Sequence, residues 1–197
     1  IAEHLANIGK EVQLLDIVPY EKKKKKKKKG LTKEDKAVRN RIATESLAKL
    51  VKASPALLYK KEFAERISVG NFDDDLQKIK NTDWIIEVVV ERLDIKKSVY
   101  EKIEQFRKPG TLVSSNTSGI PINMLVEGRS ADFKHYFAGT HFFNPVRYLP
   151  LLEIIPTKDT DAEIVKFYME YGAKFLGKTT VLAKDTPAFI ANRIGVF

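Results

Sequence analysis

The chain has 197 residues, of which 43% are hydrophobic and 31% are charged. These values are ordinary for a globular protein, and the length allows one good-sized domain or one domain with a fragment of another. There is no cysteine, which excludes disulfide bonds and cysteine-based zinc sites. No apolar run approaches the roughly 20 residues of a membrane-spanning helix, and no secretory signal opens the chain. We therefore expect no membrane span and a cytoplasmic location, or a mitochondrial or peroxisomal one in a eukaryote.

The net charge of +9 comes almost entirely from eight consecutive lysines at residues 22–29. Without them the balance is +1 (9 − 8). Such a run repels itself, so a solvated loop is the simplest interpretation and a phosphate-binding patch is the alternative. Nucleic-acid binding would rest on this run alone and would be strongly salt-dependent. We therefore expect no nucleic-acid partner.

The first elements predict part of a nucleotide-binding unit. Residues 1–8 form a short amphipathic pattern typical of a helix, and Gly9 ends it. Residues 11–16 then predict a strand that ends in Asp16. In a Rossmann βαβ unit, the acid at the end of the second strand binds the ribose hydroxyls of the adenosine. Asp16 fits that role, and it favours NAD over NADP because a carboxylate repels a 2′-phosphate.

Strands and helices alternate along the rest of the chain. Residues 35–53 predict an amphipathic helix, and a second helical segment after Pro55 makes a helical hairpin up to about residue 67. Strands are expected at 67–69, 84–90, 111–113, 136–140, 149–156 and 179–183, and further helices at 94–106 and 161–175. The run 84–90 is nearly all apolar, as in a strand that helices cover on both faces. The alternation predicts an α/β fold, a Rossmann-type doubly wound, mostly parallel sheet with a helical hairpin excursion.

Two apolar runs carry the residues that suggest chemistry. The run 149–156 contains a single charge, Glu153, which is costly to bury unless another group pairs with it. His141 follows the neighbouring strand, so we predict a His–Glu pair across two adjacent strands. A neutral imidazole suits proton removal from an alcohol, and a carboxylate on its other nitrogen would fix the tautomer. The alternatives are a core histidine bonded to the backbone and an exposed acid on an edge strand.

Polar residues follow several of the predicted strands. They are Asp16, Glu91 and the groups at 115–118 and 141–144. Ligands of open α/β sheets bind at the carboxyl ends of the strands, so we expect these groups to contribute to one site.

Four segments together resemble a known family. They are SNTS at 115–118, HFFNP at 141–145, LEIIP at 152–156 and KDTPAFIANR at 184–193. In order and spacing they resemble the NAD-binding domain of the L-3-hydroxyacyl-CoA dehydrogenases of fatty-acid β-oxidation, and the resemblance covers nearly the whole chain. It implies oxidation of L-3-hydroxyacyl-CoA to 3-ketoacyl-CoA with NAD as cofactor. No metal is needed, because the nicotinamide carries the hydride.

The resemblance also implies a role for individual residues. His141 would be the general base and Glu153 its partner, while Ser118 and Asn192 would hydrogen-bond the substrate oxygen. Ser46, on the helical excursion, would contact the acyl-CoA. Cofactor-binding positions of the family are matched by Asp16, Glu91, Lys96, Asn116 and Asn144. Lys96 could instead face solvent, as could the adjacent Lys97, and Asn192 could be a simple helix residue.

The resemblance implies a domain organisation as well. Residues 1–184 would be the NAD-binding domain, with its first strand and glycine-rich loop located before residue 1. Residues 185–197 would begin a helical C-terminal domain that supplies dimer contacts and part of the substrate pocket. The protein would therefore be a homodimer or part of a multifunctional β-oxidation enzyme. One alternative is a dehydrogenase for a small 3-hydroxy acid without CoA, whose activity would not change on mutation of Ser46. The other is a non-catalytic protein that retains the fold.

Overall fold

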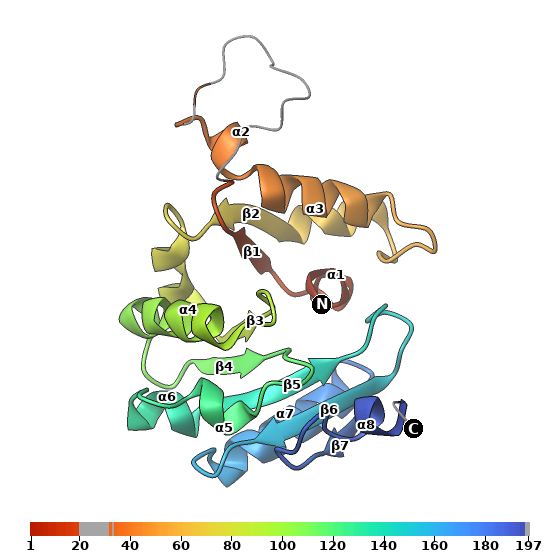
Figure 1. The fold of residues 1–197 in the computed structure, drawn as a ribbon. Helices are drawn as coiled ribbons and strands as arrows, with labels where there is room; N and C mark the ends of the chain where they lie inside the picture. The colour runs from red at the N-terminus through yellow and green to blue at the C-terminus, as the bar shows by residue number, and fades with distance from the viewer. Residues whose placement is uncertain (20–31, 33, 196–197) are drawn as a thin grey trace. The chain divides into compact units, whose positions relative to one another are not determined.

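The computed structural model describes residues 1–19, 32 and 34–195, so the lysine run at 22–29 lies outside the described residues. The chain divides into two compact units, Ile1–Leu76 and Gln77–Phe197, which are described separately below (Figure 1). Within the described part of the chain, no helix is both long and apolar enough to cross a membrane.

The first unit is built on a two-stranded parallel sheet. β1 (Val12–Asp16) pairs with β2 (Ile67–Asn71) in a register that sets Asp16 opposite Asn71. α1 (Ala2–Asn7) precedes β1, and Gly9 allows the turn between them through its positive φ of 85°. The long connection from β1 to β2 contains α2 (Lys36–Arg39), α3 (Arg41–Val51) and the 3-10 helix η1 (Lys61–Arg66).

The helical hairpin predicted for this connection is only partly correct. The expected helix at 35–53 is interrupted at Asn40 between α2 and α3, and the returning arm contains the short 3-10 helix η1 instead of an α-helix. The short returning arm is explained by the side chain of Asn7, which donates to the carbonyl of Leu57 at 2.9 Å and accepts from the amide of Tyr59 at 2.8 Å. These bonds hold residues 57–59 against α1, so their backbone groups are not available for a helix.

The second unit contains a five-stranded sheet in the order β3-β4-β5-β6-β7. Its strands are β3 (Trp84–Glu87), β4 (Leu112–Ser115), β5 (Phe137–Phe142), β6 (Leu151–Pro156) and β7 (Thr179–Leu182). All neighbouring pairs are parallel except β5 and β6, which run antiparallel. The predicted mostly parallel sheet is thus confirmed, with one reversal in its middle.

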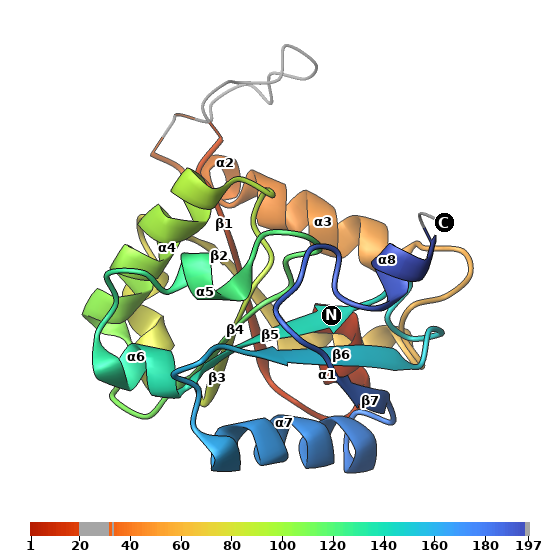
Figure 2. The ribbon, with the colours of Figure 1, turned by 60° about the horizontal axis from the view of Figure 1, so that its bottom comes forward.

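Helices flank this sheet on both sides (Figure 2). α7 (Ala162–Lys174) lies along one face, and α4 (Leu93–Phe106), α5 (Ile122–Leu125) and α6 (Ala131–His135) lie on the other. α7 approaches closely because Gly172 has no side chain: a Cβ there would be 2.5 Å from the Cγ2 atom of Thr180. On the opposite face, the rings of Tyr100, Phe133 and Phe137 pack with centroids 5.4–5.7 Å apart.

β3 is shorter than the predicted strand at 84–90. It ends at Glu87, and Val88 and Val90 are each 58% exposed, so this run is not covered on both faces. The carboxylate of Glu87 accepts a hydrogen bond of 2.6 Å from the amide of Val89. That bond turns the backbone back toward the strand end, which an apolar pattern alone does not reveal.

Candidate functional site

The pairing of β5 with β6 brings the predicted His–Glu pair together. The antiparallel register sets His141 opposite Glu153, and the imidazole Nδ1 lies 2.7 Å from the carboxylate Oε2. His141 is 4% exposed and Glu153 is fully buried. The predicted pairing across two adjacent strands is confirmed, and neither a backbone-bonded histidine nor an exposed edge acid describes these residues.

The second oxygen of Glu153 binds a different part of the chain. Its Oε1 atom accepts hydrogen bonds from the amides of Ile190 and Ala191, at 3.0 and 2.8 Å. Three donors therefore surround a buried carboxylate, which offsets the cost of removing its charge from water. The same two bonds fix the start of α8 (Ala191–Gly195) beside the histidine.

The environment of His141 determines which ring nitrogen can act as a base. A carboxylate only accepts hydrogen bonds, so the neutral imidazole carries its proton on Nδ1 and leaves Nε2 as the basic atom. The ring packs against Phe143 at a centroid distance of 4.4 Å and against Phe189 at 5.7 Å. These apolar neighbours limit the access of water to the pair.

The carboxyl end of β4 lies beside this pair. The side chain of Asn116 accepts a hydrogen bond of 2.9 Å from the amide of Phe142, the residue after the histidine. Ser118 is exposed on the following loop, and its carbonyl lies 3.5 Å from the amide nitrogen of the Asn192 side chain. Asn116, Ser118 and Asn192 are therefore close in space although they come from two distant parts of the sequence.

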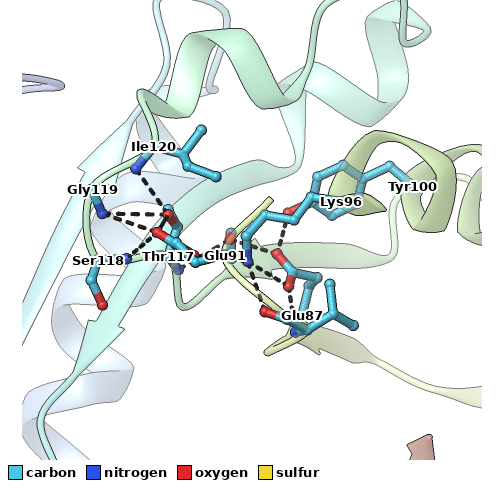
Figure 3. A network of polar contacts seen from close by, with 10 residues as sticks. Glu87, Glu91, Lys96, Tyr100, Thr117, Ser118, Gly119 and Ile120 are labelled. Atoms are coloured by element: carbon cyan, nitrogen blue, oxygen red, sulfur yellow. Dashed lines mark hydrogen bonds and ion pairs between the residues drawn. The ribbon is translucent and has the colours of Figure 1, made fainter. Parts of the chain in front are cut away.

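Glu91 binds the same loop. Its Oε1 atom accepts from the Thr117 hydroxyl and from the amides of Ser118 and Gly119, the last two at 3.0 and 3.2 Å (Figure 3). Burial on its own would raise the pKa of Glu91, but the hydrogen bonds from Thr117 and Ser118 and the charge of Lys96 lower it below its usual range. Glu91 is therefore ionised at neutral pH.

Lys96 is buried and does not face solvent. It is 1% exposed, and its ammonium lies 2.8 Å from Glu87, 3.3 Å from Glu91 and 3.2 Å from the carbonyl of Val89. The neighbouring Lys97 is partly exposed and pairs with Glu127 on the surface at 2.7 Å. The solvent-facing alternative is therefore wrong for Lys96.

The remaining predicted residues are less closely connected. Asn144 is exposed in the loop that follows β5. Asp16 ends β1, where its carboxylate accepts from the amide of Ile17 at 2.7 Å, and Ser46 is exposed on α3. Asp16 and Ser46 both belong to the first unit, so their participation in the site stays a prediction.

Sequence reasoning gave no role in the site to two buried residues: Glu87, which binds Lys96, and Tyr100, which binds Glu87. Glu87 carried a signal, because it is a lone charge in an apolar strand, as Glu153 is. Among the described residues, no group of three or more His, Cys, Asp or Glu side chains could hold a metal ion.

Known proteins share this arrangement of sequence and fold. The family model for the 3-hydroxyacyl-CoA dehydrogenase NAD-binding domain matches residues 1–186. A probable 3-hydroxyacyl-CoA dehydrogenase of Bacillus subtilis is 55% identical over the whole chain, which spans 25% of that protein. A probable 3-hydroxyacyl-CoA dehydrogenase of Deinococcus radiodurans is 46% identical, again over the whole chain, which spans 53% of it.

A solved structure agrees with the fold. The 3-hydroxybutyryl-CoA dehydrogenase of Escherichia coli superimposes with a TM-score of 0.75 and 28% identity, over 99% of this chain and 37% of that one. The chain therefore spans between a quarter and about half of these relatives' lengths. By its family match and its similarity along its whole length, the chain belongs to the family of 3-hydroxyacyl-CoA dehydrogenase NAD-binding domains.

Proposed function

We propose that the chain is the coenzyme-binding part of an NAD-dependent dehydrogenase that oxidises L-3-hydroxyacyl-CoA to 3-ketoacyl-CoA in β-oxidation. Residues 1–184 would form its NAD-binding domain, and 185–197 the start of a helical domain. The observation that carries this proposal is the buried His141–Glu153 pair beside the loop of Ser118. The names of the Bacillus subtilis and Deinococcus radiodurans relatives support it.

The second unit has groups that suit NAD. β3, β4 and β5 are parallel, and Glu91, Asn116 and Asn144 follow their carboxyl ends, where dinucleotides bind in this type of sheet. The ionised Glu91 could accept hydrogen bonds from sugar hydroxyls, and Asp16 would do so for the adenosine ribose. When bound, the nicotinamide accepts the hydride from the alcohol carbon of the substrate.

The chain itself would supply the acid–base chemistry. His141 Nε2 takes the hydroxyl proton as the carbonyl forms, and Glu153 stabilises the resulting imidazolium through Nδ1. Ser118 and Asn192 would hydrogen-bond the reacting oxygen. Lys96 would support the coenzyme site through its ion pair with Glu91, and Ser46 would contact the CoA moiety.

The proposed partners follow from the chain's relation to longer proteins. The chain spans a quarter of the Bacillus subtilis relative, which is consistent with a multifunctional enzyme, and a homodimer is the other assembly to test. The substrate would be a coenzyme A thioester, and the proposed location is the cytoplasm, or the mitochondrion or peroxisome in a eukaryote.

Turnover of acetoacetyl-CoA by the full-length protein tests the proposal. We expect NADH consumption, and we expect His141→Gln to lower the rate at least about 10²-fold, because the imidazole that donates the proton in reduction and accepts it in oxidation is lost. His135→Gln, on the exposed side of α6, serves as the control and should turn over normally. A folded protein that binds NADH but does not reduce acetoacetyl-CoA would contradict the proposal, and turnover of a free 3-keto acid would then indicate a small-acid dehydrogenase.

A further inference from the structure

Glu87, which the proposed chemistry does not use, is buried at the end of β3. Its side chain is 0% exposed, and both of its oxygens are fully occupied. Oε1 accepts from the Lys96 ammonium at 2.8 Å and from the Val89 amide at 2.6 Å. Oε2 accepts from the hydroxyls of Tyr100 and Ser115, at 2.6 and 2.7 Å.

The groups around the Glu87 carboxylate are all hydrogen-bond donors to it. The Lys96 ammonium and the Val89 amide can only donate hydrogen bonds. The Ser115 hydroxyl donates to Glu87 and accepts from the Thr117 amide at 3.2 Å. Burial, and then the negative charge of Glu87, raise the pKa of Tyr100 well above its usual value, so the phenol keeps its proton and donates it. Four donors converge on Glu87, and a carboxylate is the form that accepts all four.

Lys96 connects this buried carboxylate to the surface. Its ammonium lies between Glu87 and Glu91, so a negative, a positive and a negative charge follow one another from the interior outward (Figure 3). Glu91 is 44% exposed, yet its other oxygen is bound by Thr117, Ser118 and Gly119. The position of Glu91 and of the Ser118 loop therefore depends on where Lys96 is held.

We infer that Glu87 is a positioning residue for the coenzyme site, acting through Lys96 to hold Glu91 at the carboxyl end of the sheet. The inference rests on the proposed function, in which Glu91 binds NAD. A buried ammonium needs a compensating charge. Without the charge of Glu87, Lys96 is left with Glu91 as its carboxylate partner in this network, and it draws Glu91 inward from the place where it meets the coenzyme.

Direct titration of the full-length protein with NADH tests this role. Glu87→Gln should fold, because the amide oxygen can face Lys96 and Val89 while its NH2 group faces the hydroxyls of Tyr100 and Ser115, which rotate to accept. We expect NADH to bind about tenfold more weakly, within the range measured for residues coupled in one hydrogen-bond network. Lys97→Gln is the matched control: it removes a surface ion pair on the same helix and should leave NADH affinity unchanged.

A double-mutant cycle with Glu91→Gln separates positioning from general loss of structure. If Glu87 acts through Glu91, adding Glu87→Gln to Glu91→Gln weakens NADH binding less than about twofold further. Independent, additive losses would overturn the inference, as would normal NADH affinity of Glu87→Gln alone.

Two further outcomes are informative. If Glu87→Gln does not fold, Tyr100→Phe keeps the ring that packs on Phe133 and Phe137 and removes one donor to Glu87. We expect it to weaken NADH binding about threefold, and only when Glu91 is present; unchanged affinity would overturn the inference. A wild-type protein that does not bind NADH would overturn the proposed function and this inference together, whereas normal wild-type binding with an unaffected Glu87→Gln would overturn this inference alone.

Discussion

At the scale of single residues, the two oxygens of Glu153 serve two different purposes. One orients the imidazole of His141, and the other holds the amides of Ile190 and Ala191. The backbone just before these amides has positive φ at Ala188 and Phe189, 63° and 50°, which costs energy for residues with a side chain. Glu153 thus stabilises an unfavourable turn while it fixes the tautomer of the base.

This double role predicts a severe defect for Glu153→Gln. In one orientation the glutamine NH2 group donates to Nδ1, which moves the imidazole proton to Nε2 and removes the base. In the other, the NH2 group faces two amide donors and the turn before α8 is destabilised. We expect oxidation of an L-3-hydroxyacyl-CoA with NAD to fall about 10³-fold or more, as expected when the imidazole is in the wrong tautomer.

The NADH affinity of the same variant should be unchanged, because Glu153 does not belong to the network of Glu87 and Glu91. Glu163→Gln, at an 82% exposed position on α7, is the control and should turn over normally. Normal turnover by Glu153→Gln would show that the pair is structural only.

The sequence could predict the His141–Glu153 pair but not the buried network of Glu87, Lys96 and Tyr100 next to Glu91. A lone carboxylate in an apolar run marks both Glu153 and Glu87. For Glu153, the histidine on the neighbouring strand was an evident partner. The partners of Glu87 lie 9, 13 and 28 residues away, at Lys96, Tyr100 and Ser115. The packing of α4 on the sheet brings Lys96 and Tyr100 to Glu87, and the pairing of β3 with β4 brings Ser115.

At the scale of elements, Glu104 connects α4 to the start of α6. Its carboxylate accepts from the amide of Ser130 at 2.8 Å and from the guanidinium of Arg129 at 3.1 Å. Burial on its own would raise the pKa of Glu104, but the bonds from Ser130 and the charge of Arg129 lower it below the ordinary value of 4.5. A lowered pKa in the folded state means that this stabilisation is present above about pH 4.5 and is lost as the pH falls through the folded pKa.

We therefore expect Glu104→Gln to lower the free energy of unfolding by about 1 kcal/mol at pH 7 and by little at pH 3. Urea unfolding at the two pH values measures the difference. Glu170→Gln, which removes an exposed pair with Lys174 on α7, is the control and should leave the free energy of unfolding nearly unchanged at both pH values. An equal loss at both pH values would show that the charge of Glu104 is not what stabilises the contact.

Most elements could be predicted from apolar periodicity, and the exceptions have a common cause. β3 stops early because Glu87 binds the amide of Val89, and the returning arm of the helical hairpin is not an α-helix because Asn7 binds the backbone of Leu57 and Tyr59. In both cases a side chain takes backbone groups that a longer strand or helix would need. The reversal of β6 did carry a signal, since the connection at 143–150 is shorter than the dozen or so residues of a parallel crossover.

At the scale of the whole molecule, the lysines at 22–29 dominate the net charge. Replacing all eight with glycine and serine would reduce it from +9 to +1. We expect this variant to lose salt-dependent retention on an immobilised polyanion and to keep its NADH-dependent turnover. A weaker affinity for NADH or for the CoA substrate would instead assign phosphate binding to these lysines.

The overall α/β architecture could be predicted, but the division of the candidate site residues between two compact units could not. The alternation of strands and helices was sufficient for the mostly parallel sheet. Sequence alone gave no sign that Asp16 and Ser46 lie in one compact unit and His141 and Glu153 in another. Such a division depends on long-range contacts, which leave no periodic trace in the chain.

The antiparallel pairing of β5 and β6 has a consequence for how this chain tolerates insertions and deletions. His141 and Glu153 are 12 residues apart, but it is the strand register that sets them opposite each other. Extra residues within 143–150 lengthen a loop and leave that register intact. Deleting one residue of β6 before Glu153 has one of two effects. If Glu153 stays opposite His141, the β6 side chains that precede the deletion turn to the other face of the sheet. If those side chains keep their faces, the Glu153 carboxylate moves away from the imidazole. Homologous chains can therefore differ in the length of this loop and still retain the pair.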